Sequence, residues 1–361
     1  MLTAEAVIDI AALRHNYQFI QGKCPTAKIA AVLKANAYGH GAVKFAKALP
    51  QADAFAVSRL QEAVELREAG IEQPILLLEG CFCPDELRRA SALNLHSMIH
   101  NQRQLEELER SALSKPLQVW LKIDTGMHRL GILPEQVDDY VRRIKASVNA
   151  KNEIRFASHF NCADELQSST TLQQIACFEE ATQAYCGAKS LSNSAAILHW
   201  PDAHYDWLRP GIALYGIAPR VESCGRDEGL RAVMTLKSKL ISVREQKRGG
   251  PVGYGQNWIA PRDTRIGVVA MGYGDGYPRS APSGTPVLVN GRRVPIVGTI
   301  SMDMITVDLG PDGKDQVGDE VIFWGDELPA EEVARHIGTI GYELVIKLTA
   351  RVKKSYTNFV N

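Results

Sequence analysis

Short apolar runs alternate with helix-forming segments over roughly the first 200 residues, and this alternation constrains the fold more than any other feature. Each run has the length of a buried strand and is bounded by turn residues. The segments 61–69 and 102–111 between the runs consist of good helix formers, and Gly70 follows the first as a C-cap. Eight strands that alternate with helices predict an α/β fold with an N-terminal (β/α)8 TIM-type barrel. The predicted strands cover residues 29–34, 54–58, 75–78, 95–99, 117–123, 154–159, 190–192 and 205–209.

An open, doubly wound sheet is the alternative α/β arrangement. Dinucleotide-binding sheets of this kind carry a Gly-x-Gly-x-x-Gly sequence after the first strand. The first predicted strand is not followed by such a sequence. The barrel is therefore the preferred interpretation.

Polar side chains stand where the predicted strands end. In a barrel, the carboxyl ends of the parallel strands open at one mouth, where the chemistry of such folds is found. We therefore expect the strand-end residues to form one site: Lys34, Glu79, Lys122, Asp124, His159, Asn193, Ser194 and Arg209.

Ordinary structural roles are the alternative for three of these residues. His159 could be a hydrogen-bonded core histidine. Asn193 and Ser194 could simply cap a helix, because both residue types are favoured at N-caps. A helix N-terminus with free N–H groups is also a phosphate site, so the capping role does not exclude function.

Two buried cations are harder to explain as surface residues. Lys122 lies within an apolar run, so its charge would be buried and would need a partner, unless 122–131 is only a solvated turn. Arg209 follows an apolar run and precedes Pro-Gly. It could belong to a plain turn, or it could point inward while the backbone N–H groups of Gly211 and Ile212 face a ligand.

The sequence supports its most specific hypothesis at Lys34. A half-buried lysine loses its proton more easily than an exposed one, because burial disfavours the charged form. It can then form a Schiff base with a carbonyl cofactor such as pyridoxal phosphate. Tyr38, four residues later, could offer its hydroxyl to a phosphate. The alternative is an ordinary lysine at the end of a strand.

The last third of the chain changes character at about residue 232. Long β-rich runs appear at 234–244, 265–271, 286–296, 304–308 and 320–324, and Asn290-Gly291 between two apolar stretches is a strong hairpin signal. We therefore predict two domains, a barrel over 1–230 and a mainly β domain over 231–361. A small β domain could be only a lid or a dimerisation plate. However, Tyr254 and Tyr273 are flanked by glycines, as suits exposed loops with close backbone approach.

The bulk composition excludes several functional classes. Forty-one basic and 41 acidic residues give a formal net charge of zero, which argues against nucleic-acid binding through a basic surface. The N-terminal sequence lacks the pattern of a secretory signal, and the apolar stretches are too short to span a membrane. The seven cysteines form no CxxC pair. We expect reduced thiols in a cytoplasmic protein and no metal site.

The sequence Val-Leu-Lys-Ala-Asn-Ala-Tyr-Gly-His-Gly at 32–41 resembles the cofactor-lysine motif of the alanine racemases. Segments 121–131, 158–160, 192–195, 209–216, 252–256, 271–279, 298–303 and 341–343 are similar to further signatures of that family, in the same order. The resemblance spans essentially the full chain. It implies interconversion of L-alanine and D-alanine with pyridoxal phosphate, for peptidoglycan synthesis or alanine catabolism.

The resemblance also implies a role for each matching residue. Lys34 would hold the cofactor and act as the base on one face of the substrate, and Tyr254 of a partner subunit in a homodimer would act on the other face. Arg209 would face the pyridine nitrogen, and Lys122 would be carbamylated and pair with Arg129. The remaining implied residues near the cofactor are His159 and Asn193 beside it and Tyr38, Ser194, Gly211, Ile212 and Tyr342 at its phosphate. Arg129 would steer the substrate carboxylate or the cofactor phenolate, Met302 would contact the substrate, and Tyr273, Asp164 and Arg279 would lie at the entrance.

Two positions depart from the family pattern. Ser301 stands where the family often has a cysteine, and Thr299 stands near the place of a common arginine. Both departures concern the entrance and its selectivity, and catalysis should survive both. One rival hypothesis is a related decarboxylase of basic amino acids, but such enzymes usually place a carboxylate rather than an arginine against the pyridine nitrogen. The other rivals are a racemase of serine or larger amino acids, a non-catalytic pyridoxal-phosphate carrier, and a metabolic barrel of unknown reaction.

Overall fold

The computed structural model describes residues 3–359, which divide into two compact units. One unit consists of Tyr17–Ala37 and Gly41–Leu214, and we call it the barrel unit. The other contains the remaining described residues, and we call it the C-terminal unit. Within residues 3–359, no helix combines the length and the apolar character that crossing a membrane requires.

The barrel unit is built on eight parallel strands, as the alternating pattern predicts. In spatial order the strands run β8-β7-β6-β5-β4-β3-β2-β9. Backbone hydrogen bonds of 3.1 Å from Asp206 to Lys189 and from Arg209 to Ser192 join the two ends of this sheet, so the strands close on themselves. The strands are β2 (Lys28–Val32), β3 (Ala54–Val57), β4 (Ile75–Leu77), β5 (His96–Ile99), β6 (Gln118–Lys122), β7 (Arg155–Ala157), β8 (Lys189–Ser190) and β9 (Trp207–Leu208).

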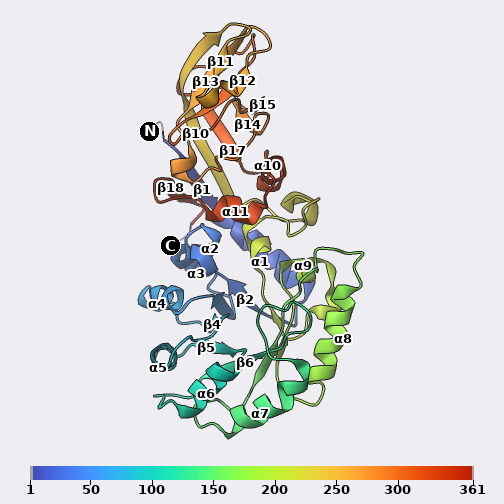
Figure 1. Ribbon diagram of the computed structural model, residues 1–361. Helices are drawn as coiled ribbons and strands as arrows, with labels where there is room; N and C mark the ends of the chain where they lie inside the picture. Colours follow the sequence, from blue (N-terminus) through green and yellow to red (C-terminus); the bar gives the residue numbers. More distant parts are fainter. Residues whose placement is uncertain (1–2, 360–361) are drawn as a thin grey trace. The chain divides into compact units, whose positions relative to one another are not determined.

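Helices follow the strands and form the outer layer of the barrel unit (Figure 1). The predicted helices at 61–69 and 102–111 are confirmed, and Gly70 has a φ of 83°, the left-handed value typical of a residue that ends a helix. The helices are α3 (Ala42–Ala48), α4 (Leu60–Glu68), α5 (Pro84–Ala92), α6 (Gln102–Arg110), α7 (Val137–Ala146), α8 (Thr170–Thr182) and α9 (Ser194–His199). Helix α1 (Ile10–Lys23) precedes them.

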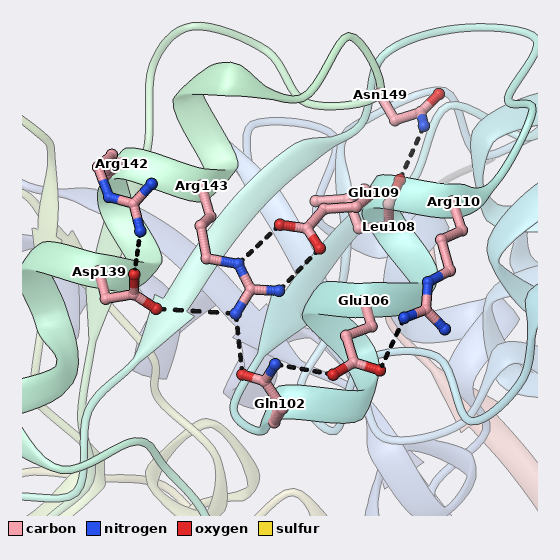
Figure 2. Close-up of polar contacts among 9 residues, drawn as sticks. All are labelled: Gln102, Glu106, Leu108, Glu109, Arg110, Asp139, Arg142, Arg143 and Asn149. Atoms are coloured by element: carbon pink, nitrogen blue, oxygen red, sulfur yellow. Dashed lines mark hydrogen bonds and ion pairs between the residues drawn. The ribbon is translucent and has the colours of Figure 1, made fainter.

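A polar network fastens α6 to α7 on the outside of the barrel unit, as Figure 2 shows. Arg143 of α7 holds Glu109 of α6 with two parallel bonds of 2.7 Å and reaches Gln102 at 3.0 Å. Such a bidentate pair fixes orientation, although partly exposed ion pairs contribute only about 0.2–1 kcal/mol each. The network therefore sets how the two helices pack and lies apart from the strand ends.

The amino-terminal side of the barrel interior is filled by aromatic rings and a cation. Trp120 of β6 and Trp207 of β9 meet edge-on with centroids 5.5 Å apart. The guanidinium of Arg155 lies 5.3 Å and 4.9 Å from these two rings, a cation–π arrangement. The interior is thus a packed core, and polar chemistry is left to the opposite, carboxyl ends of the strands.

The C-terminal unit is mainly β, as predicted, with the sheet order β15-β14-β17-β10-β1-β18 and with β13 joining β10 to β16. Asn290 and Gly291 have φ values of 50° and 76° and form the predicted hairpin between β14 and β15. The strands are β10 (Met234–Gln246), β11 (Pro251–Val252), β12 (Trp258–Ile259), β13 (Thr264–Val269), β14 (Pro286–Val289), β15 (Arg292–Pro295), β16 (Ile305–Asp308), β17 (Glu320–Trp324) and β18 (Lys353–Thr357).

Several elements of this unit were not predicted from the sequence, among them β11, β12 and β18. Strand β1 (Glu5–Asp9) pairs antiparallel with β10 and parallel with β18, so the start of the chain belongs to the sheet of the C-terminal unit. Two helices, α10 (Ala330–Ile337) and α11 (Gly341–Ile346), follow β17. The division of the chain at 230 and 231 stays a prediction about its domains.

Candidate active site

Lys34 lies two residues beyond the end of β2, at the start of a left-handed turn (Lys34–Tyr38) labelled α2. Residues 35–38 all have φ between 49° and 53°. Left-handed helical backbone costs non-glycine residues roughly 1–2 kcal/mol each, so surrounding contacts must hold this turn in place. The amide of Ala37 donates to Leu33 at 2.8 Å, and the side chain of Asn36 accepts from Ala42 at 2.8 Å.

The amine of Lys34 is partly buried, and its environment favours the neutral form. Burial lowers the pKa of Lys34, and the positive charge of Arg129 lowers it further, against the opposing carboxylates of Glu79 and Glu62. A larger share of the amine is therefore unprotonated at neutral pH than for an exposed lysine. An unprotonated amine is what both carbonyl capture and proton abstraction require.

Lys122, the last residue of β6, is only 8% exposed. Burial lowers the pKa of Lys122 to about 7, with further contributions from the positive charges of Arg209 and Arg129 that exceed the opposing charge of Asp124. The predicted burial of this lysine is therefore confirmed. The carboxylate of Asp124 is engaged with the backbone, because its Oδ1 accepts three amide hydrogen bonds of 3.0 Å from residues 126, 127 and 128.

Arg209 and His159 complete a group of basic side chains at the strand ends. Arg209 is 5% exposed and donates to the backbone carbonyls of Ser158 and Leu191 and to the hydroxyl of Ser190. His159 is partly buried, and burial together with the charges of Arg209, Lys122, Arg129 and Lys34 keeps its pKa well below its usual range. The imidazole is therefore neutral at physiological pH, so it can accept as well as donate a hydrogen bond.

A hydrogen-bonded relay behind these residues involves side chains that the sequence analysis did not select. Gln174 of α8 donates to the Thr125 hydroxyl at 3.3 Å and to the His159 carbonyl at 3.1 Å, and its carbonyl oxygen accepts from the Asn161 amide at 3.1 Å. Thr125 is bonded in turn to the Ser158 hydroxyl at 2.8 Å. Ser158, Thr125 and Gln174 are all buried, so this relay fixes the segments that follow β6 and β7.

The segments after β8 and β9 are tied together by Ser194. Its hydroxyl oxygen accepts the amides of Gly211 at 3.0 Å and Ala213 at 3.2 Å. Asn193 caps α9, since its side chain accepts the Ala196 amide at 3.1 Å. Asn193 thus has the capping role that was the alternative to a ligand contact. Ser194, Gly211 and Ile212 lie together at one part of the strand ends.

Three tyrosines cluster within the C-terminal unit. The ring of Tyr38 lies 4.7 Å from that of Tyr215 and 6.2 Å from that of Tyr342, measured between centroids. Tyr38 is 6% exposed, and burial raises its pKa well above the usual range, so its hydroxyl keeps its proton and remains a hydrogen-bond donor. Of these residues, Tyr215 was not singled out from the sequence.

Tyr254 occupies an exposed patch of the C-terminal unit that three loops build. It is 70% exposed, and the glycines on either side have φ values of 77° and 70°, which few other residues adopt. Thr299 donates to the Tyr254 carbonyl at 3.3 Å. The amides of Tyr273 and Gly274 donate to the carbonyls of Ser301 and Met302 at 3.1 Å and 2.8 Å. The loop with Thr299, Ser301 and Met302 is therefore bonded both to the loop of Tyr254 and to the loop of Tyr273.

Known proteins resemble this chain over its whole length. The model of the alanine racemase N-terminal domain matches residues 8–219, and that of the C-terminal domain matches residues 233–356. An alanine racemase from Vibrio cholerae is 54% identical over 356 residues, which are 99% of either chain.

The chain belongs to the alanine racemase family.

Solved alanine racemases also share the fold. The biosynthetic alanine racemase of Pseudomonas aeruginosa matches with a TM-score of 0.96 at 46% identity and covers 99% of this chain and 100% of its own. The alanine racemase of Bartonella henselae, whose structure holds covalently bound pyridoxal phosphate, matches with a TM-score of 0.88 at 30% identity and covers 98% of this chain and 99% of its own. The (β/α)8 barrel and the mainly β C-terminal part are therefore those of the alanine racemases.

The residues expected from the alanine racemase resemblance are distributed over both units. Those of the barrel unit are Lys34, Lys122, Arg129, His159, Asp164, Asn193, Ser194, Arg209, Gly211 and Ile212, and those of the C-terminal unit are Tyr38, Tyr254, Tyr273, Arg279, Met302 and Tyr342. Asp164 is partly buried and Arg279 is exposed. Their assignment to an entrance stays a prediction.

Proposed function

We propose that this chain interconverts L-alanine and D-alanine with pyridoxal phosphate, using Lys34 and Tyr254 as the two bases. The position of Lys34 is the main support for this proposal. It is a partly buried lysine with a lowered pKa, at the end of a barrel strand, in a chain of the alanine racemase family. Basic groups that act on one another's pKa surround it, which suits a polyanionic cofactor and a substrate carboxylate.

The side chains present fit pyridoxal phosphate. Lys34 supplies the amine for covalent attachment, Arg209 supplies a buried cation, and the Ser194 hydroxyl with the Ile212 amide supplies phosphate ligands, as do Tyr38 and Tyr342 by our assignment. Gly211, whose amide donates to Ser194, is a further proposed neighbour of the phosphate. His159 and Asn193 are further proposed neighbours of the cofactor. When bound, the cofactor withdraws electrons from the α-carbon of the amino acid and makes its hydrogen acidic enough to be removed.

Racemisation needs one group that removes the α-proton and another that supplies a proton on the opposite face. Lys34 can serve one face, because its lowered pKa leaves a larger share of its amine unprotonated than in an exposed lysine. We assign the other face to Tyr254 of a second copy of this chain. The exposure of Tyr254, together with Met302 at 52% and Tyr273 at 38%, supports a partner that covers this patch.

Arg209 has a specific consequence for the reaction. It is held by two carbonyls and a hydroxyl, and these neutral partners leave its positive charge in place. A guanidinium donates hydrogen bonds and accepts none. Facing the pyridine nitrogen, it would disfavour protonation there and so limit full carbanion development and the transamination that follows from it.

Arg129 and Met302 are the proposed substrate contacts, with Arg129 steering the alanine carboxylate. Lys122 is the proposed site of carbamylation, in which its neutral amine adds to carbon dioxide and releases a proton. A pKa of about 7 supports this, because it leaves the amine unprotonated for a large part of the time at neutral pH. The resulting anion would pair with Arg129. Tyr273, Asp164 and Arg279 are assigned to the entrance.

We further propose a homodimer that acts in the cytoplasm, with a barrel domain over 1–230 and a β domain over 231–361 that contributes Tyr254 to the partner's site. The ratio of kcat/KM for alanine to that for serine measures the strictness for alanine.

Incubation of the purified protein with either pure enantiomer of alanine, with added pyridoxal phosphate, tests the proposal. The enantiomer ratio should drift to an equal mixture from both sides, and Lys34→Ala should abolish the drift. Racemisation that persists in Lys34→Ala, or no drift in the unaltered protein, contradicts it.

A further inference from the structure

One carboxylate joins the two segments that follow β2 and β3 in the barrel unit. Glu62 is the third residue of α4 and is partly buried. Its Oε1 accepts the amide of Ala35 at 2.6 Å, and its Oε2 accepts the amides of Ser58 and Arg59 at 2.9 Å each. Both oxygens are therefore engaged with backbone, on either side of the gap between adjacent strand ends.

The Ala35 amide is the link to the reactive lysine. Ala35 directly follows Lys34 and is the first of four consecutive non-glycine residues in the left-handed conformation. Such backbone persists only where its surroundings over-determine it. A hydrogen bond from an amide to a charged carboxylate is roughly twice as strong as a neutral one, so Glu62 is well suited to hold the entry of this turn.

Glu62 also acts on Lys34 through its charge. Three charged side chains affect the Lys34 amine: the cation of Arg129 opposes its protonation, and the carboxylates of Glu79 and Glu62 favour it. Glu62 is the only one of these three side chains that accepts a hydrogen bond from the amide of Ala35, the residue next to Lys34, among the hydrogen bonds described for residues 3–359. It therefore combines a fixed backbone contact with an electrostatic one.

We infer that Glu62 is a positioning residue that holds the Lys34 side chain in its reactive orientation. It does so by tying the Ala35 amide, which follows β2, to the amides of Ser58 and Arg59, which follow β3. The inference rests on the proposed function in that Lys34 is taken as the cofactor lysine. The contact between Glu62 and the left-handed turn does not depend on the cofactor.

The test compares Glu62→Ala and Glu62→Gln with Glu65→Gln in the full-length protein. Glu65 lies one turn further along α4 and is exposed, which makes it a matched control. Glutamine keeps one carbonyl oxygen and can accept on one side of the clamp only, so Glu62→Gln should be the milder variant and should remain folded.

Two measurements are needed, and neither depends on racemisation. The first is amide hydrogen exchange of the peptide that covers residues 34–41, without cofactor. The second is the rate at which pyridoxal phosphate labels Lys34, trapped by borohydride reduction and located by peptide mass spectrometry. Glu62→Ala should exchange about tenfold faster in this peptide and label Lys34 several-fold more slowly. Glu62→Gln should lie in between, and Glu65→Gln should match the unaltered protein.

Unchanged exchange in Glu62→Ala overturns the clamp. Faster exchange with an unchanged labelling rate overturns the positioning role, because the turn would then be loosened without effect on Lys34. If the unaltered protein labels Lys34 but does not racemise alanine, the proposed function fails while the inference about Glu62 stands.

Discussion

The guanidinium of Arg209 donates from its Nη1 to the hydroxyl of Ser190. The same hydroxyl donates to the Trp207 carbonyl at 2.7 Å, so it cannot turn away without losing a bond. Ser190 is fully buried. A neutral hydroxyl therefore orients the buried cation of the strand ends without cancelling its charge, which a carboxylate in this place would do.

Ser190→Ala should loosen Arg209. The substitution leaves a buried donor and a buried acceptor without this partner, at a cost of about 1–3 kcal/mol in the free energy of unfolding. Activity with alanine should fall about tenfold, because misplacement of a site group slows catalysis. Urea unfolding and steady-state kinetics measure the two effects.

Ser192→Ala is the matched control for this prediction. Ser192 is also fully buried, and its hydroxyl donates to the Ala203 carbonyl at 2.5 Å. It should lose similar stability and keep its activity. Equal activity in the two variants would mean that the Ser190 hydroxyl does not orient Arg209 for function.

Lys122 should make stability depend on pH. Its pKa is about 7 in the folded protein and about 10.4 in an unfolded chain. Between these values the unfolded chain binds more protons, so the free energy of unfolding rises with pH, and the penalty of the buried charge is complete below pH 7. In carbonate-free buffer, Lys122→Met should therefore be the more stable protein near pH 7, with an advantage that shrinks by about 3 kcal/mol towards pH 10.

Bicarbonate should reverse the sign of this effect if Lys122 is carbamylated. The unaltered protein would then carry an anion beside Arg129, and Lys122→Met would lose that pairing and become the less stable protein. Urea unfolding at several pH values, with and without bicarbonate, separates the two states. An advantage of Lys122→Met that is independent of both pH and bicarbonate would contradict the account of Lys122.

Gln174→Leu should destabilise the barrel unit through the relay behind His159. The change removes the partner of the Thr125 hydroxyl, the His159 carbonyl and the Asn161 amide. Leaving such buried groups unpaired costs about 1–3 kcal/mol each, with partial relief from water at the less buried ones, so a total of about 2–4 kcal/mol is expected.

Gln173→Leu changes an exposed neighbour on the same helix in the same way. Its free energy of unfolding should stay within about 0.5 kcal/mol of the unaltered protein. Similar losses in the two variants would show that the helix, rather than the relay, is sensitive to the substitution.

The sequence predicted the barrel well because its strands are buried on both faces and so appear as short apolar runs. Seven of the eight predicted runs contain the corresponding strand or all but its first residue, and the run at 190–192 shares only Ser190 with β8. The observed strands are mostly shorter than the runs because pairing ends before the polar residue that follows, as at Lys34 and His159. The same feature identified the strand-end residues of the site.

Other parts could not be predicted from local patterns. Strand β1 is five residues long with alternating burial, and such a strand fits any open sheet edge, so nothing local assigns it to β10 and β18. The left-handed turn at residues 35–38 contains no glycine, which removes the usual signal for positive φ. Glu62, Gln174 and Ser190 are common polar residues, and each has at least one partner that lies 17 to 49 positions away along the chain.

Exchange of the α-hydrogen distinguishes a two-base racemase from an enzyme with a base on one face only. L-alanine is incubated in deuterated water with the purified protein and pyridoxal phosphate, and both the α-deuterium content and the enantiomer ratio are followed, with Tyr254→Phe in parallel. We expect deuterium at the α-carbon together with drift to an equal mixture. In Tyr254→Phe, the rate of α-hydrogen exchange should fall more for L-alanine than for D-alanine incubated in the same way. Exchange with retained L-configuration in the unaltered protein, or no exchange at all, would contradict a racemase that works with two bases.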